Sequence, residues 1–222
     1  MNNSVTNTAR LLGAGLRALL VLTLVTGVVY PLAVTGIAQG LFGDKADGSE
    51  IKADGKVVGS SLIGQRGYTL DYFQPRPANG LGENSVNTRY ALLLSGATNL
   101  AADNKDLVRQ VEDARAAVVE DNSVPGHPVR PSDVPADAVT SSGSGLDPDI
   151  SPRYAELQVH RVAERNHLSV ARVRKLVDEH TEGRTLGFIG EPRVNVLELN
   201  IALRGLVTHG VANGDSTHMS PK

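Results

Sequence analysis

One long stretch near the start of the chain is mostly apolar. No residue between Arg17 and Asp44 carries a formal charge. The 25 residues from Ala18 to Phe42 would form a helix about 37 Å long at a rise of 1.5 Å per residue. The hydrocarbon core of a bilayer is about 30 Å thick, so a helix of this length crosses it. The pattern predicts a transmembrane helix over residues 18–42, preceded by a short N-terminal segment, 1–17.

The charges on either side of this stretch predict its orientation. Arg10 and Arg17 precede it, whereas Asp44, Lys45, Asp47 and Glu50 follow it. Positive side chains stay on the cytoplasmic side, so we expect a cytoplasmic N-terminus and an external C-terminal domain. A cleaved signal peptide is the alternative. Its apolar region usually covers about 7–15 residues and ends in an A-x-A site, whereas this one is longer and has no such ending.

Four residues within the span predict contacts with other membrane helices. Pro31, which follows Tyr30, removes a backbone donor and should kink the helix. Gly36 and Gly40 form a small-xxx-small pair, which lets another helix approach closely. The alternative is that Gly and Pro are simply common in membrane helices.

After residue 43 the apolar residues fall in short segments, some with the alternation of a strand and some with the spacing of a helix. Alternating and β-branched residues predict short strands within 50–63 and an extended piece over 68–73, after which Pro75 and Pro77 exclude a helix. Helical spacing returns at 103–120, with Asp103 or Asn104 as the N-cap. A long Pro- and Ser-rich loop is expected over about 121–151.

The C-terminal part predicts a helical hairpin and a final strand. Ser151 and Ser169 are placed to cap two helices, the first running to about residue 165. Residues 194–203 suit a strand or a short helix, and their β-branched side chains favour the strand. A flexible tail is expected over 205–222. The fold class is therefore predicted as α+β, with one N-terminal transmembrane helix followed by a single mixed α/β extracytoplasmic domain over 43–204.

Composition excludes several kinds of function. All 24 acidic residues lie after residue 43, with all but two of the 22 basic ones, so this region is mildly acidic and lacks the basic surface that nucleic acid requires. The absence of Cys excludes disulfides and thiolate chemistry. Gly183, Gly187 and Gly190 do not match a phosphate-binding loop, and the six His lack metal-site spacing. We expect no catalytic residue, no metal site and no enzyme activity from this chain alone.

Seven sequence blocks resemble a known family when they are taken in order and at their separations. They are 29–32 (VYPL), 59–65 (GSSLIGQ), 72–77 (YFQPRP), 95–100 (SGATNL), 144–152 (SGLDPDISP), 158–163 (QVHRVA) and 190–200 (GEPRVNVLELN). Over roughly residues 10–203 the chain is similar to the C subunit of the Kdp potassium-transporting ATPase. Ala97 and Thr98 depart from the usual pattern, in which Gly and Ser stand there. Ala97 would be costly if its position needed a positive φ.

The resemblance implies an accessory subunit in a bacterial plasma-membrane complex. Its expected partners are membrane lipid, a channel-like potassium-translocating subunit and a P-type ATPase subunit. The family's role is that of a catalytic chaperone that promotes ATP binding and stabilises assembly. No covalently bound cofactor is implied, and ATP would act through the ATPase subunit.

Gln158 is the residue that the resemblance links to nucleotide, and the alternative is an exposed or capping amide on a helix. An external domain does not meet cytoplasmic ATP, so it could instead gate or position ion entry without touching nucleotide. A free-standing membrane-tethered binding or sensor protein is the hypothesis from a different class.

Overall fold

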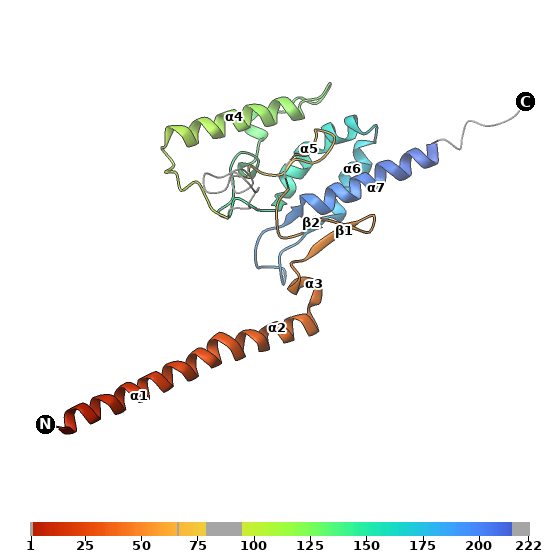
Figure 1. The fold of residues 1–222 in the computed structure, drawn as a ribbon. Coiled ribbons are helices and arrows are strands. Elements are labelled where there is room, and N and C mark those ends of the chain that lie inside the picture. The colour runs from red at the N-terminus through yellow and green to blue at the C-terminus, as the bar shows by residue number, and fades with distance from the viewer. Residues whose placement is uncertain (1, 66, 79–94, 215–222) are drawn as a thin grey trace, which may run out of the picture. The chain divides into compact units, whose positions relative to one another are not determined.

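The computed structural model describes residues 2–65, 67–78 and 95–214, which form two compact units, Met1–Glu50 and Ile51–Lys222 (Figure 1). The first unit is helical. The second combines helices with short strands. The mixed class expected from the sequence is confirmed, as is an N-terminal apolar helix ahead of the mixed region.

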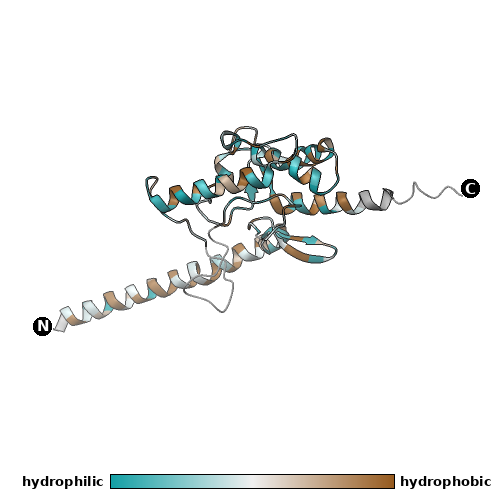
Figure 2. Cartoon of the chain, turned by 90° about the horizontal axis from the view of Figure 1, so that it is seen from above, coloured by the Kyte–Doolittle hydropathy of each residue, from teal (hydrophilic) through white to brown (hydrophobic). Residues whose placement is uncertain are grey.

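The first unit is one nearly continuous helical segment. It comprises α1 (Asn2–Leu24), a π-helical turn η1 (Val25–Val29), α2 (Tyr30–Leu41) and the short α3 (Gly43–Ala46). The stretch Ser4–Leu41 is long and apolar enough to cross a membrane, and apolar residues follow its length in Figure 2. The helix begins well before residue 18, because the polar residues at its start are helical as well.

A π-helical turn directly precedes Tyr30 and Pro31, the place where a kink was expected. Proline has no N–H to donate, and its ring crowds the carbonyl four residues earlier. The turn before it is widened, so that the Tyr30 N–H donates to the Val25 carbonyl, five residues back. The hydroxyl of Thr26 also donates to the Leu22 carbonyl, at 2.7 Å. Such single wide turns are a recognised way for a helix to accommodate a proline.

The second unit contains two small sheets. Strands β1 (Glu50–Ala53) and β2 (Lys56–Ser60) form a hairpin, and its turn residues Asp54 and Gly55 both have positive φ. The other sheet has the order β3 (Asp149–Ile150), β5 (Arg193–Asn195), β4 (Thr181–Glu182) and is antiparallel. Val194 pairs with Ile150 on one side and with Thr181 on the other.

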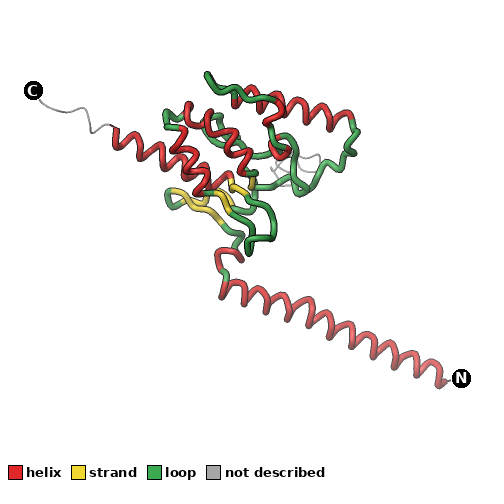
Figure 3. Tube along the Cα trace, turned by 180° about the vertical axis from the view of Figure 1, so that it is seen from behind, coloured by secondary structure: helices red, strands yellow, loops and turns green. Residues whose placement is uncertain are grey.

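Helices form much of the rest of the second unit and are drawn in red in Figure 3. They are α4 (Lys105–Asn122), α5 (Pro152–Arg165), α6 (Val170–Glu179) and α7 (Val196–Gly214). The caps predicted for the first three are confirmed, since the side chains of Asn104, Ser151 and Ser169 accept hydrogen bonds from backbone N–H groups in the first turns. Helices α5 and α6 pack against each other as the predicted hairpin.

The strand predicted over 194–203 is wrong beyond Asn195. Helix α7 begins at Val196, and Val196, Leu199 and Leu203 are buried at helical spacing. The Asn195 side chain accepts from the Glu198 N–H at 3.2 Å and so caps the helix start. Packing of this face outweighs the β-preference of the branched residues. The helix continues to Gly214, into the segment expected to be a tail, and residues 215–222 lie outside the described chain.

The segments expected to be a long loop and an extended piece both have irregular structure that packs against the core. The stretch 121–151 contains the 3₁₀ turns η2 (Pro131–Asp133) and η3 (Ala136–Ala138), and it buries Val129, Ala138 and Val139. The extended piece expected over 68–73 is interrupted by a turn in which the Tyr72 N–H donates to the Thr69 carbonyl at 3.0 Å, and Phe73 is fully buried. Both segments cover the core that α5 and α7 build.

Candidate functional site

Gln158 lies on the buried face of α5. Its neighbours on that face, Ala155, Val159 and Val162, are fully buried and Gln158 is equally so, at 0% exposure. The side chain is therefore neither an exposed nor a capping amide.

The Gln158 amide binds the backbone of Gln74. Its Oε1 accepts from the Gln74 N–H at 2.6 Å, and its Nε2 donates to the Gln74 carbonyl at 3.1 Å. A side-chain amide that pairs with both backbone groups of one residue acts as a neighbouring strand would. The backbone of a partly buried segment without strand partners is thereby satisfied.

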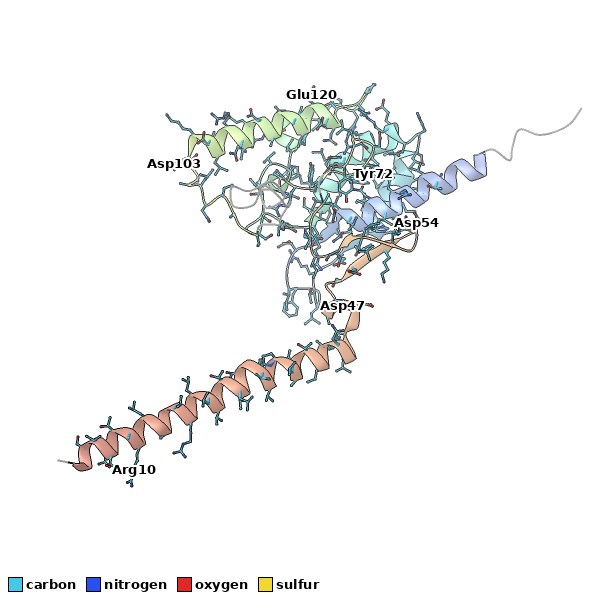
Figure 4. The ribbon with its side chains drawn as sticks, viewed as in Figure 1. Arg10, Asp47, Asp54, Tyr72, Asp103 and Glu120 are labelled. Carbon is cyan, nitrogen blue, oxygen red and sulfur yellow. The ribbon has the colours of Figure 1, made fainter. Side chains whose placement is uncertain are left out.

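Asn200 of α7 makes the same pair of bonds to the preceding residue. Its Oδ1 accepts from the Phe73 N–H at 2.9 Å, and its Nδ2 donates to the Phe73 carbonyl at 2.9 Å. Two helices therefore hold two consecutive residues through their side-chain amides. Tyr72, the residue before them, lies beside α5 and α7 in Figure 4.

Arg161 extends this network toward α4. Its guanidinium donates to Oε1 of Gln158 at 2.7 Å, to the Tyr72 carbonyl at 2.9 Å and to the Leu70 carbonyl. Its Nε donates to Oδ1 of Asn122 at 2.9 Å. The planar fork of arginine suits several carbonyl acceptors at once.

These four residues account for the buried polar and charged side chains of the described chain. Asn122, Gln158, Arg161 and Asn200 are each at most 3% exposed. We call them the polar clamp, because all four bond, directly or through one another, to residues 70–74. Buried polar groups in protein interiors are retained when such bonds satisfy them.

Burial shifts the pKa of two groups in this region. It lowers the pKa of Arg161 to about 10, a shift opposed by the nearby Tyr154, and the guanidinium stays protonated at neutral pH. Burial also raises the pKa of Tyr154 to about 12. The clamp therefore carries one positive charge, and its acceptors are amide and carbonyl oxygens.

The sequence alone identified only Gln158 among the clamp residues. A signal for the others was present, because Arg161 and Asn200 fall at the same helical spacing as the buried apolar residues around them. The strand predicted over 194–203 does not have the helical spacing that places Asn200 among buried residues.

A second group of side chains lies on the face of α5 opposite to Gln158. The rings of His127 and His160 stack with centroids 3.6 Å apart, close to Glu156 and Arg174, which pair at 2.6 Å. Burial, and then electrostatic interaction with His127 and Arg174, lower the pKa of His160. In the described part of the chain no three His, Cys, Asp or Glu side chains come together in a way that would hold a metal ion.

A sequence model of the KdpC family, described as the c chain of the K⁺-transporting ATPase, matches residues 12–205. The chain belongs to this family.

Individual relatives agree over nearly the whole chain. It is 75% identical to the potassium-transporting ATPase KdpC subunit of Streptomyces avermitilis over 219 residues, covering 93% of this chain and 99% of the relative. The KdpC subunit of Streptomyces coelicolor is 71% identical over 226 residues, covering 96% and 100%. That of Mycobacterium tuberculosis is 45% identical over 188 residues, covering 85% and 94%.

Two glycines in the family blocks stand where the structure leaves no room for a side chain. Gly59 stands where a Cβ would lie 2.8 Å from the Leu197 side chain, and Gly64 where a Cβ would lie 2.7 Å from the Asp147 carbonyl oxygen. Ala97, by contrast, does not adopt a positive φ, whereas Asn99 two residues later does. The departure from the family pattern at Ala97 therefore carries no backbone strain.

The four membrane residues singled out in the sequence lie together on α2. Tyr30 and Pro31 begin this helix, and Tyr30 is 65% exposed. A Cβ at Gly36 or Gly40 would meet no atom within 4 Å in the described chain. The space around both glycines is open in the described chain, as it is at Gly13 and Gly15 of α1.

Proposed function

We propose that this chain is the accessory subunit of an ATP-driven potassium-uptake complex, in which it promotes ATP binding by the ATPase subunit and stabilises assembly. The observation that supports this most is that all four polar clamp residues bind the chain's own structure. Within the described residues these four side chains are already engaged by the chain itself, so in this proposal an effect on nucleotide acts through contacts with another subunit.

The partners are the channel-like potassium-translocating subunit and the P-type ATPase subunit of the same complex. In this proposal the chain crosses the plasma membrane once, with its N-terminus in the cytoplasm, as Arg10 and Arg17 favour. The second unit then lies outside. Its influence on ATP passes through α2, whose Gly36 and Gly40 surface is open for helix packing.

A second candidate function is that the external domain gates or positions potassium entry without touching nucleotide. The acidic excess after residue 43 favours it, because a negative surface raises the local cation concentration.

The two candidates differ in which substrate they affect. The complex is purified with and without this chain, and the KM for ATP and the KM for K⁺ are measured on each preparation. The chaperone proposal expects a higher KM for ATP and poorer recovery of the other subunits when the chain is absent. A change in the KM for K⁺ alone supports the second candidate and contradicts the first.

Gln158 has an indirect role in this proposal, as a positioning residue for the segment 70–74. Gln158→Ala and Asn200→Ala each remove one pair of bonds to this segment, and Gln158→Ala also removes the oxygen that accepts from Arg161. Asn200→Ala is therefore the control for losing such a pair without disturbing Arg161. An equal rise in the KM for ATP in both variants is expected if the segment transmits the effect. A rise in Gln158→Ala alone would point instead to a direct contact between Gln158 and nucleotide.

A further inference from the structure

The loop between β4 and β5 presents large apolar side chains to solvent. Every residue from Glu182 to Arg193 is exposed. Within this loop Leu186, Phe188 and Ile189 are 79%, 71% and 51% exposed. We call these three residues the apolar tip. Phe188 is one of only three Phe in the whole chain.

The backbone of the tip is an ordered tight turn. Thr185 and Ile189 exchange two hydrogen bonds of 2.9 Å, and the Phe188 N–H donates to the Thr185 carbonyl at 3.3 Å. Leu186 and Gly187 have φ values of 55° and 83°, which are typical of a type I′ turn. Asn, Asp or Gly is favoured at the first of these positions, and a leucine there is strained. Folding alone therefore does not explain Leu186.

Ion pairs fix the base of the same loop. Arg184 and Glu191 pair across it at 3.0 Å. Arg193 bonds to Glu182 at 2.6 Å and to Asp149 of β3 at 3.1 Å. A turn that is closed at its tip and paired at its base presents its apolar side chains from a defined backbone. Such preorganisation lowers the entropy lost on binding.

We propose that the apolar tip docks into an apolar pocket on another subunit of the transport complex. Charge argues against the lipid surface as the occupant. Residues 182–193 contain two basic and two acidic side chains, and each basic one is paired with an acidic one. Loops that insert into bilayers usually carry unpaired cations for the anionic headgroups. Compact, rigid aromatic and aliphatic anchors are instead typical of protein interfaces.

The docking proposal rests on the subunit role proposed above, and a photocrosslinking experiment tests it directly. p-Benzoylphenylalanine is placed at position 188 in the assembled complex in its membrane and irradiated. The control carries it at position 108, an exposed apolar site on α4. We expect an adduct with a partner subunit from position 188 and none from position 108. An adduct with lipid, or no adduct from position 188, overturns the proposal.

A second measurement keeps folding apart from docking. Leu186→Asn removes the apolar side chain but suits a positive φ, so the variant should fold at least as well as the parent chain. Retention of the chain in the purified complex should fall about tenfold, as for loss of an interface anchor. The control Val108→Thr should retain the chain fully. Unchanged retention in Leu186→Asn overturns the docking proposal.

The same preparations separate this inference from the proposed function. If the parent chain leaves the KM for ATP unchanged while retention depends on Leu186, the chaperone role fails and the docking stands. If the parent chain lowers the KM for ATP and Leu186→Asn behaves like it in every assay, the docking fails and the chaperone role stands.

Discussion

Arg161 donates a hydrogen bond to Gln158, 2.7 Å away and one turn earlier on α5. The same Gln158 oxygen also accepts from the Gln74 N–H. A buried cation, a side-chain amide and a distant backbone are thus joined at one oxygen atom. Removal of the cation leaves the carbonyls of Leu70 and Tyr72 without this donor.

We therefore expect Arg161→Met to destabilise the domain. The variant loses a buried, hydrogen-bonded charge and leaves its acceptors without a donor. We expect the free energy of unfolding to fall by about 3 kcal/mol. Thermal unfolding of the full chain in detergent, followed by circular dichroism, measures the effect. The control Arg165→Met changes an exposed arginine on the same helix and should leave the midpoint nearly unchanged. Equal midpoints for the two variants would contradict a structural role for the clamp.

The stacked histidines predict a pH dependence of stability. The pKa of folded His160 lies below the ordinary value of about 6.5, so the unfolded chain binds more protons as the pH falls. Stability from neutral His160 is therefore present above about pH 6.5 and is lost as the pH falls through the folded pKa.

The measurement is the unfolding midpoint between pH 7.5 and 5. The variant His160→Gln should lose part of the slope that the parent chain shows. His167→Asn is the control, because His167 is exposed and Asn tolerates its positive φ of 54°. The prediction fails if His160→Gln keeps the full slope.

Gly64 makes a close backbone approach that should not tolerate a side chain. Its N–H donates to the Leu146 carbonyl at 2.8 Å, and an added Cβ would lie 2.7 Å from the Asp147 carbonyl oxygen. We expect Gly64→Ala to lower the free energy of unfolding by about 1–3 kcal/mol, because the backbones at Gly64 and Asp147 must move apart. Gly183→Ala, where a Cβ meets nothing within 4 Å, is the control in the same unfolding assay. Similar midpoints in both variants would show that the contact relaxes without cost.

Gly36 and Gly40 should matter for assembly and not for the fold of this chain. Replacing both by Leu places side chains where the described chain has open space, so its own unfolding midpoint should stay constant. A partner helix would be held away, and recovery of the other subunits with this chain should fall. Ala38→Leu, about 200° around the helix from Gly36, is the control. Full recovery with the double variant would remove helix packing from the proposed assembly.

Local spacing and capping predicted several elements well. The apolar helix and the caps at Asn104, Ser151 and Ser169 depend on residues within one or two turns of each other, and the structure confirms them. The C-terminal strand failed because Val194, Val196 and Ile201 satisfy a strand pattern locally. Burial of Leu199 and Leu203 against the core decided for the helix.

The sequence by itself determined the family, the apolar helix and the capped helices of this protein, since each depends on the order and spacing of nearby residues. Only the tertiary structure decided that Gln158 and Asn200 hold Gln74 and Phe73, because these partners are 84 and 127 positions apart in the chain. It also decided that Leu186 is strained and exposed at the tip of a turn, since backbone conformation and solvent access arise only when the whole domain has folded.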